Sequence, residues 1–279
     1  MKHSTRNARP GLHVYVGQVL FFGPPDTITI VTPEISVVVP LRDEEPNVLP
    51  LHNELSAVMQ GIGLSYELIC VDDGSEDRTF GRLTEVQARD PQMRVIRFTR
   101  NFGQTAAFAA GFAYARGRLI VTSDGDLQND PADIPRLLDL TRNHDIVYGW
   151  RKDRKDNVLT RHVPSVVANW LLSHATGIRL HDYGCSLKVF RAEVVKPLKL
   201  APGMHRYLPA LASQLGNRVV EVVVHHRPRR FGRSKYGLSR TFGVVRDLLR
   251  LRSLMRQAID PAAQTTTSYE IQQILGTAP

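Results

Sequence analysis

The sequence predicts an α/β fold in which helices flank a mostly parallel central sheet. Between residues 35 and 150, short apolar or β-branched runs alternate with segments of helical periodicity, a pattern typical of parallel strands joined by helices. The chain has 279 residues, 42% hydrophobic and 23% charged, so it can bury the core of one such domain. No apolar run reaches the roughly 18 residues that a membrane-spanning helix requires.

The first half of the chain shows this alternation most clearly. A β-branched run over residues 35–39 predicts a strand that Pro40 is expected to end. The next helix has apolar residues at Val48, Leu51 and Leu55, and Gly61 and Gly63 follow as stop signals. By the same criteria, further strands are predicted over residues 66–71, 95–98, 119–122 and 146–148, and helices over residues 48–60, 77–89, 105–116 and 134–141.

The second half of the chain has a looser pattern. Helices are predicted over residues 163–176 and 207–215, and strands over residues 187–190 and 219–225. Residues 238–256 have apolar side chains at helical spacing, such as Leu238 and Phe242, with five arginines at other positions. The apolar side of this basic amphipathic helix either packs on the domain or lies on a membrane surface, and periodicity alone does not separate the two.

These patterns divide the chain into four parts. Residues 1–33 lack periodicity and contain several prolines, which predicts a flexible N-terminal arm. The other parts are the α/β domain, an amphipathic membrane-surface helix and a disordered tail, over residues 35–237, 238–256 and 257–279. A signal-peptide cleavage site is not evident, and Cys70 and Cys185 are too few for a disulfide scaffold. We therefore expect a cytoplasmic protein that is peripherally associated with a membrane.

Charge is distributed unevenly along the chain. The net charge is +9, but residues 1–150 carry 14 Lys and Arg against 19 Asp and Glu, whereas residues 151–256 carry 22 against 6. The cationic half implies an anionic partner: phosphate, an anionic membrane surface or a nucleic acid. Nucleic-acid-binding proteins usually show aromatic or helical readout elements beside such charge, and none is evident, so no nucleic-acid partner is expected.

Two carboxylates end the strand predicted over residues 66–71. Asp72 and Asp73 are followed by Gly74, and adjacent carboxylates repel unless each has a donor or a cation. One interpretation is a contact with a nucleobase N–H or a ribose hydroxyl. The other is an Asp-Gly turn in which Asp73 caps the next helix, and the motif alone leaves both open.

A second acidic motif follows the strand predicted over residues 119–122. Asp124 and Asp126, separated by Gly125, can converge on one hard cation such as Mg²⁺ or Mn²⁺. That cation would bridge the phosphates of a nucleotide diphosphate, and Gly125 would allow close backbone approach. The alternative is an acidic surface loop, but α/β sheets bind ligands at the carboxyl ends of their strands, where Asp73 is also expected.

A basic segment covers residues 226–236. It has five cations between residues 227 and 235, with Pro228 and Gly232 keeping it irregular. Such a segment suits the oxygens of phosphate groups. The alternative is a nucleic-acid or targeting patch.

Together these motifs resemble glycosyltransferase family 2 over about residues 35–250. The first four lie at Val39-Pro40 with Glu44, and at residues 72–75, 101–104 and 124–129. Later motifs at residues 149–151, 182–188 and 231–236 resemble the polyprenyl-phosphate branch of that family. Arg42 departs from the pattern, since the family usually has a tyrosine there.

This resemblance implies a GT-A fold and an inverting transfer from a nucleotide-diphosphate sugar to a polyprenyl phosphate, with Mg²⁺ or Mn²⁺ as cofactor. It further implies an anionic membrane surface or a separate membrane subunit as partner. The nucleotide sugar is expected at Pro40, Glu44, Val71, Asp73, Asp124, Gly125, Asp126 and Gln128, with the metal at Asp124 and Asp126. Phosphates are expected at Arg151, Arg229, Arg233, Ser234 and Lys235, and the expected catalytic residues are Asp124, Asp126 and Arg151.

Two other functions stay open on the sequence. A family 2 enzyme could transfer a sugar to a polysaccharide hydroxyl, although a neutral acceptor does not need the cations of residues 227–235. A noncatalytic membrane-binding homologue could keep the fold, although the intact pair of Asp124 and Asp126 argues for catalysis.

Overall fold

The structure is a computed structural model of the whole chain, and it describes residues 32–152, 178, 180–231 and 267–276. The predicted arm, the helix over residues 163–176, and the basic helix over residues 238–256 lie outside the described residues, apart from residues 32 and 33 of the arm. The same holds for Arg233, Ser234 and Lys235.

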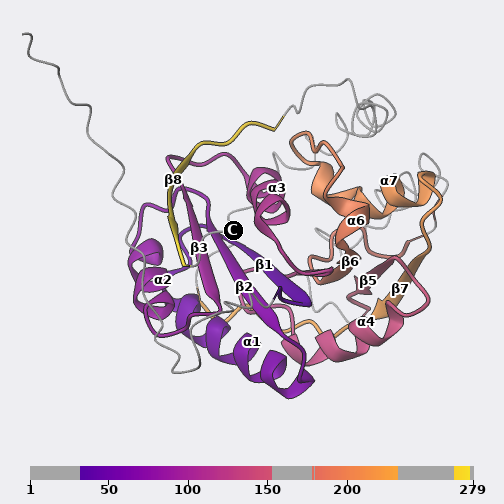
Figure 1. Cartoon of the computed structure of the whole chain (residues 1–279), viewed down its shortest axis with the longest axis horizontal. Coiled ribbons are helices and arrows are strands. Elements are labelled where there is room, and N and C mark those ends of the chain that lie inside the picture. The colour runs from indigo at the N-terminus through magenta and orange to yellow at the C-terminus, as the bar shows by residue number, and fades with distance from the viewer. Residues whose placement is uncertain (1–31, 153–177, 179, 232–266, 277–279) are drawn as a thin grey trace, which may run out of the picture. The chain divides into compact units, whose positions relative to one another are not determined.

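In the described part of the chain, eight strands form one sheet in the order β7-β5-β6-β4-β1-β2-β3-β8 (Figure 1). They are β1 (Ile35–Leu41), β2 (Tyr66–Asp72), β3 (Met93–Phe98), β4 (Leu119–Thr122), β5 (Ile146–Trp150), β6 (Lys188–Arg191), β7 (Val219–Val223) and β8 (Ile271–Leu275). Strand β1 is parallel to β2 and β4, β2 to β3, and β5 to β7. The antiparallel strands are β6, between β4 and β5, and β8, on β3. The prediction of a mostly parallel sheet is confirmed.

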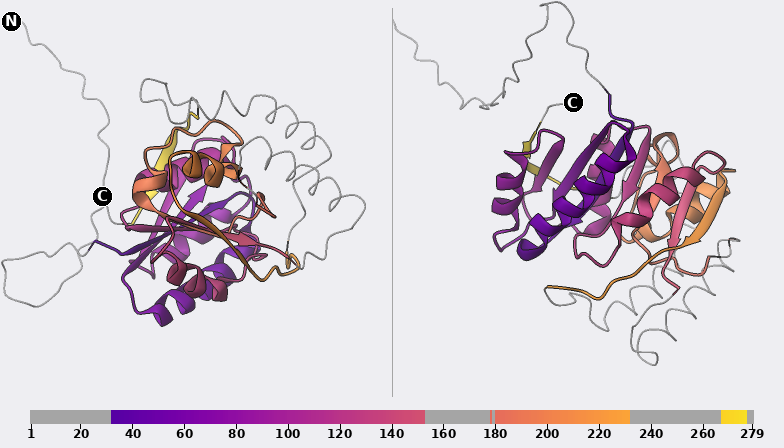
Figure 2. Two further views of the ribbon diagram at one scale, coloured as in Figure 1. Left: turned by 90° about the vertical axis from the view of Figure 1, so that its right-hand side faces the viewer. Right: turned by 90° about the horizontal axis from the view of Figure 1, so that it is seen from below.

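Helices cover both faces of this sheet (Figures 1 and 2). On one face lie α1 (Val48–Ile62), α2 (Thr79–Gln87) and α4 (Ile134–Leu140), and on the other lie α3 (Gln104–Tyr114), α6 (Ala192–Val195) and α7 (Leu208–Gln214). Short 3₁₀ turns, η1 (Glu45–Asn47), η2 (Pro131–Asp133) and η4 (Met204–Arg206), join these elements. No helix of the described residues combines the length and the apolar composition that crossing a membrane requires.

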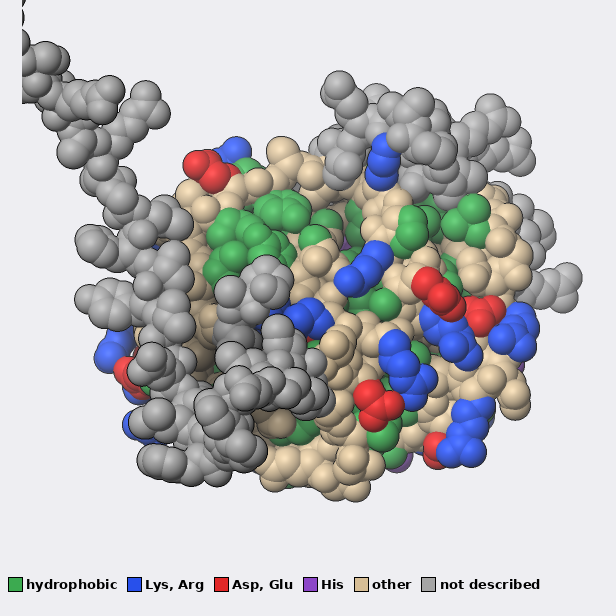
Figure 3. All heavy atoms as spheres, viewed as in Figure 1, with side chains coloured by type: hydrophobic (Ala, Val, Ile, Leu, Met, Phe, Trp, Pro, Cys, Tyr) green, Lys and Arg blue, Asp and Glu red, His purple; other side chains and the backbone are tan. Residues whose placement is uncertain are grey.

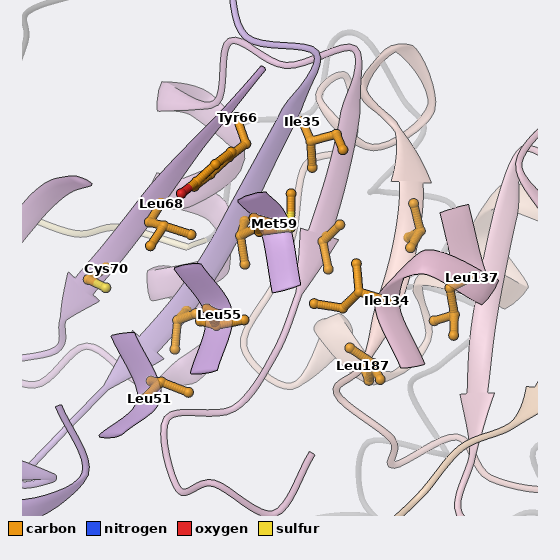
Figure 4. Close-up of a cluster of buried hydrophobic side chains, with 14 of the residues drawn as sticks. Ile35, Leu51, Leu55, Met59, Tyr66, Leu68, Cys70, Ile134, Leu137 and Leu187 are labelled. Carbon is orange, nitrogen blue, oxygen red and sulfur yellow. The ribbon is translucent and has the colours of Figure 1, made fainter. Parts of the chain in front are cut away.

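Alternate residues of the central strands fill two apolar layers. On the α1 side, Leu55 and Met59 of α1 and Ile134 of α4 point at the sheet, where they meet Ile35 and Leu68 (Figure 4). On the α3 side the layer is built from small and aromatic residues of α3. Strands buried on both faces read as continuous apolar runs, which is why the sequence located them well.

Pro40 does not end the first strand, so that prediction is wrong. Strand β1 continues to Leu41, with Pro40 in register with Val71 of β2. The backbone of Pro40 faces β4, because the neighbouring carbonyl of Leu41 accepts from Asp73 N–H on the β2 side. Pairing between β1 and β4 ends earlier, at Val38, so the missing N–H of proline costs no ladder hydrogen bond.

The disordered tail predicted over residues 257–279 is also wrong for the residues described there. Strand β8 pairs antiparallel with β3, and the ring of Tyr269 stacks on Phe98 at a centroid distance of 5.2 Å. Figure 3 shows hydrophobic side chains gathered on the face near β8 and α3. Five strand residues at a chain end give too short a pattern for periodicity to detect.

Candidate active site

The carboxyl ends of the parallel strands bring the acidic motifs together. Strands β1, β2 and β4 end at Leu41, Asp72 and Thr122, and the loops that follow lie along one edge of the sheet. Ligand sites in such sheets lie beyond these ends. The expectation that Asp73 and the Asp124 loop share an edge is confirmed by this topology.

Asp124 is held by two side chains from distant parts of the chain. Its Oδ1 accepts from Gln104 Nε2 at 2.8 Å, and its Oδ2 accepts from Ser186 Oγ at 2.6 Å. Gln104 is the first residue of α3, and Ser186 comes just before β6. The carboxylate is therefore fixed from both sides before any ligand arrives.

Asp126 is buried and faces a cation. Its Oδ1 accepts from Gln128 N–H at 3.1 Å, and its Oδ2 lies 2.5 Å from Nη2 of Arg229. Burial, followed by the charge of Asp124, raises the pKa of Asp126 to about 6. Leu127, between Asp126 and Gln128, has a φ of 62°, a conformation that costs energy in a non-glycine residue and is frequent at functional sites.

Gly125 lets this loop sit directly on the end of β1. A Cβ there would lie 3.0 Å from Leu41 Cγ and 3.2 Å from the carbonyl oxygen of Pro40. A larger residue would push the Asp124 loop away from β1. The glycine therefore permits the close approach that the sequence predicted, here toward the protein's own backbone.

Two carboxylates of this loop fit a hard divalent cation. In the described residues, no cluster of three or more His, Cys, Asp or Glu side chains could hold a metal, so Asp124 and Asp126 would supply only part of a ligand set. Mg²⁺ is commonly bound by one or two carboxylates, with water and phosphate oxygens completing its shell. The pKa of Asp126 is raised first by burial and second by the charge of Asp124, and a bound cation would offset both effects.

Asp73 is engaged by the loop that follows β3. Its carboxylate accepts from Asn101 Nδ2 at 2.9 Å, from Phe102 N–H at 2.7 Å and from Gly103 N–H at 3.0 and 3.1 Å. The side chain does not cap α2, so that alternative interpretation is wrong. Because Gly103 precedes Gln104, Asp73 fixes the start of α3 and, through it, the donor to Asp124.

Asp72 serves the turn between β2 and α2. Its Oδ1 accepts from Ser75 N–H at 3.1 Å, and its Oδ2 lies 3.7 Å from Arg97 Nε. Gly74 in this turn has a φ of 64°, and a Cβ would lie 2.3 Å from the carbonyl carbon of Arg100. The turn thus packs on the same loop that Asp73 binds.

Arg229 is the described residue of the basic segment that reaches the acidic pair. It also lies 3.4 Å from Glu44 Oε1. Arg227 instead contacts Glu54 of α1, and Arg230 lies 3.7 Å from the same carboxylate. Arg227 and Arg230 therefore anchor the segment on α1, while Arg229 contacts Asp126.

Arg151 follows β5 and is engaged by Asp182. Its Nε and Nη2 donate to the two carboxylate oxygens at 2.7 and 3.0 Å. Burial opposes the charge, but Asp182 holds the pKa of Arg151 above its ordinary value. A role of Arg151 at a substrate phosphate, which the sequence predicted, stays a prediction.

Several residues that shape the site had no role assigned from the sequence. Gln104 and Ser186 bind Asp124, and Asn101 binds Asp73. All three residues lie in motifs that carried the family resemblance. Their position inside those motifs was the available signal. Thr105 and His205, which contact each other at 2.7 Å beside the start of α3, lay in no motif that was singled out.

The fold and the site define a glycosyltransferase of the GT-A type. The structure resembles glucosyl-3-phosphoglycerate synthase from Mycobacterium tuberculosis, solved with Mn²⁺, UDP and glucosyl-3-phosphoglycerate. The TM-score is 0.62 at 20% identity, with 82% of each chain covered, so this likeness concerns the fold. Residues 36–198 match the model of glycosyl transferase family 2, and the chain belongs to that family.

Curated relatives narrow the comparison. The chain is 47% identical over 233 residues to a dodecaprenyl-phosphate galacturonate synthase of Rhizobium johnstonii, covering 82% of this chain and 69% of the relative. It is 36% identical over 218 residues to an undecaprenyl-phosphate 4-deoxy-4-formamido-L-arabinose transferase of Edwardsiella ictaluri, covering 77% of this chain and 66% of the relative.

Proposed function

We propose that the protein is an inverting glycosyltransferase that moves a sugar from a nucleotide-diphosphate sugar to a polyprenyl phosphate. Both curated relatives are named for transfer to a polyprenyl phosphate. The observation that carries the proposal is the contact of Arg229 with Asp126, because it sets a cation of the basic segment against the carboxylate pair. A site for two phosphate-bearing substrates needs both signs of charge.

The donor would lie along the ends of β1, β2 and β4. Pro40 and Val71, which are register partners, would contact the nucleoside, together with Glu44 and Asp73. The diphosphate would lie at the loop from Asp124 to Gln128. Asp124 and Asp126 would hold Mg²⁺ or Mn²⁺, which when bound neutralises the charge of the leaving nucleoside diphosphate.

The acceptor supplies its own nucleophile. A phosphate oxygen is already anionic near neutral pH, so no strong protein base is needed. That oxygen forms a bond to the anomeric carbon as the bond from this carbon to the donor diphosphate breaks, which inverts the configuration. Arg229 would stabilise the departing diphosphate, with Arg151, Arg233, Ser234 and Lys235 as further phosphate contacts, the last three on the sequence pattern alone.

Substitution of Arg229 tests this assignment. Arg229→Gln should lower transfer of labelled sugar to a prenyl phosphate by about tenfold to a hundredfold, the range for loss of a charged hydrogen bond. Arg230→Gln is the matched control, because it removes the same charge from a side chain that is 62% exposed. Equal transfer by both variants would refute the role of Arg229. Transfer to a polysaccharide hydroxyl, with none to prenyl phosphate, would overturn the proposed acceptor.

Residues 238–256 are proposed to place the enzyme on an anionic membrane surface at the cytoplasmic face, on the strength of their apolar spacing and five arginines. The expected result is sedimentation with anionic vesicles that weakens as salt rises. Replacing Arg246, Arg250 and Arg252 with Gln should weaken it without changing nucleotide affinity. Undiminished sedimentation of the triple variant would mean that residues 238–256 pack on the domain or face a partner, and recruitment would then depend on a separate membrane subunit or on the N-terminal arm.

A further inference from the structure

Lys188 is a buried lysine, and no carboxylate in the described part of the chain forms an ion pair with its ammonium. Its side chain is 3% exposed, and it lies in β6 between Thr122 of β4 and Tyr148 of β5. Its Nζ lies 4.7 Å from the centroid of the Tyr148 ring. Within the described residues, this ammonium lies against the face of that ring, and Asp124 and Asp182 act on it through their charge rather than through a hydrogen bond. Lysine is almost never buried in this way unless its charge is paired.

The carboxylates around Lys188 are occupied by other groups. Asp124 and Asp182 both act on its charge, but Asp124 already accepts two side-chain hydrogen bonds and Asp182 binds Arg151. Burial lowers the pKa of Lys188 to about 8, so the group is still mostly protonated at neutral pH. A buried cation of this kind is costly for stability, which indicates that it is kept for a ligand.

The position of Lys188 in the sheet indicates which part of the substrates it meets. The strand order places β1 and β2, with Pro40 and Val71, on one side of β4, and β6 with Lys188 on the other (Figure 1). Asp124 lies two residues beyond the end of β4, between these two sides. A group bound at Lys188 therefore lies across the Asp124 loop from the nucleoside.

We propose that Lys188 is the cation of a second anion subsite, which lies on the opposite side of the Asp124 loop from the nucleoside. There it binds a phosphate oxygen of the acceptor. The inference builds on the proposed function, because that function supplies a second phosphate to be bound. A carboxylate of an acidic donor sugar would offer the same anionic oxygens. The experiment therefore separates these two sources.

Lys188→Met and Lys188→Arg, made in the full chain, test the subsite by calorimetry with three probes: geranyl phosphate, UDP or GDP with Mn²⁺, and UDP-galacturonate against UDP-galactose. Lys188→Met should weaken geranyl phosphate binding by at least about tenfold and leave nucleoside diphosphate affinity unchanged. Lys188→Arg should restore most of the binding. The thermal midpoint of Lys188→Met should equal or exceed that of the wild type, since methionine removes an unpaired buried charge.

The opposite results are distinct from one another. Equal binding of geranyl phosphate by wild type and Lys188→Met would overturn the subsite. A loss confined to UDP-galacturonate would overturn the acceptor assignment in favour of a sugar carboxylate. An equal loss of affinity for the nucleoside diphosphates would mean that Lys188 acts only on Asp124. That result would also overturn the assignment of Lys188 to the acceptor. If the wild type itself binds no geranyl phosphate, the proposed function fails first, and the inference fails with it.

Discussion

We expect the Asp73 carboxylate to act mainly by holding the loop after β3 in place, and the loss of stability in Asp73→Ala measures this role. The carboxylate is 4% exposed and accepts from three donor groups, those of Asn101, Phe102 and Gly103. Removing it leaves three donors without an acceptor, each costing about 1 kcal/mol at the low end, or about 3 kcal/mol together. For a chain of this size that lowers the thermal midpoint by about 6 °C.

Circular dichroism melting of three variants checks this prediction. Asp73→Asn keeps one acceptor oxygen, but its new NH₂ group would face the NH₂ group of Asn101, and two donors cannot bond to each other. This variant should therefore lose part of the stability. Adding Asn101→Asp to it should recover stability, because donor and acceptor are then exchanged. Glu76→Ala, at an exposed position in the same turn, is the control. A midpoint within about 1 °C of wild type for Asp73→Ala, together with lost nucleotide affinity, would refute this structural role and leave the proposed contact with the nucleoside as the role of Asp73.

Three further changes test packing and charge. Gly111→Ala should lower the free energy of unfolding by about 1–3 kcal/mol, because its Cβ would lie 2.2 Å from a methyl group of Val38. Gly81→Ala, with open space around it, should raise that free energy by up to about 1 kcal/mol, as measured by chemical denaturation. Glu67→Gln should cost about 3–5 kcal/mol, since it leaves buried Arg94 without a counter-charge, and an unchanged midpoint would contradict this. Tyr269→Ala should lower the melting temperature and speed hydrogen exchange in β3, and unaltered protection would show that β8 docks without its stacked ring.

Much of the fold was predictable because local patterns and local structure agree. Strands β1, β2 and β4 are largely apolar and buried on both faces, and a helix such as α1 carries apolar residues at helical spacing. Parallel topology then forces the residues after each strand to one edge. This rule alone brings Asp73 near Asp124, without knowledge of any side-chain contact.

The contacts that complete the site were beyond local patterns. Ser186 binds Asp124 across 62 positions of sequence, and Arg229 meets Asp126 across 103. Such pairs depend on how β6 and the basic segment return to the sheet, which periodicity does not specify. Strand β8 was missed for a related reason, since its partner β3 supplies the hydrogen bonds that make its five residues a strand.

The edge position of β8 has a consequence for the long basic stretch that precedes it. Phe231 is the last described residue of the basic segment that carries Arg229, and Thr267 is bound through its hydroxyl to the carbonyl of Leu200. Residues 232–266 are thus tethered at both ends to the same domain, whatever conformation they take. The entropy of holding two points together rises only slowly with the number of residues between them, so the length of this stretch is no obstacle to the docking of β8 at the sheet edge. Cutting the chain between Phe231 and Thr267 should therefore leave β8 held to the domain by contacts such as those with β3 and Leu200 alone.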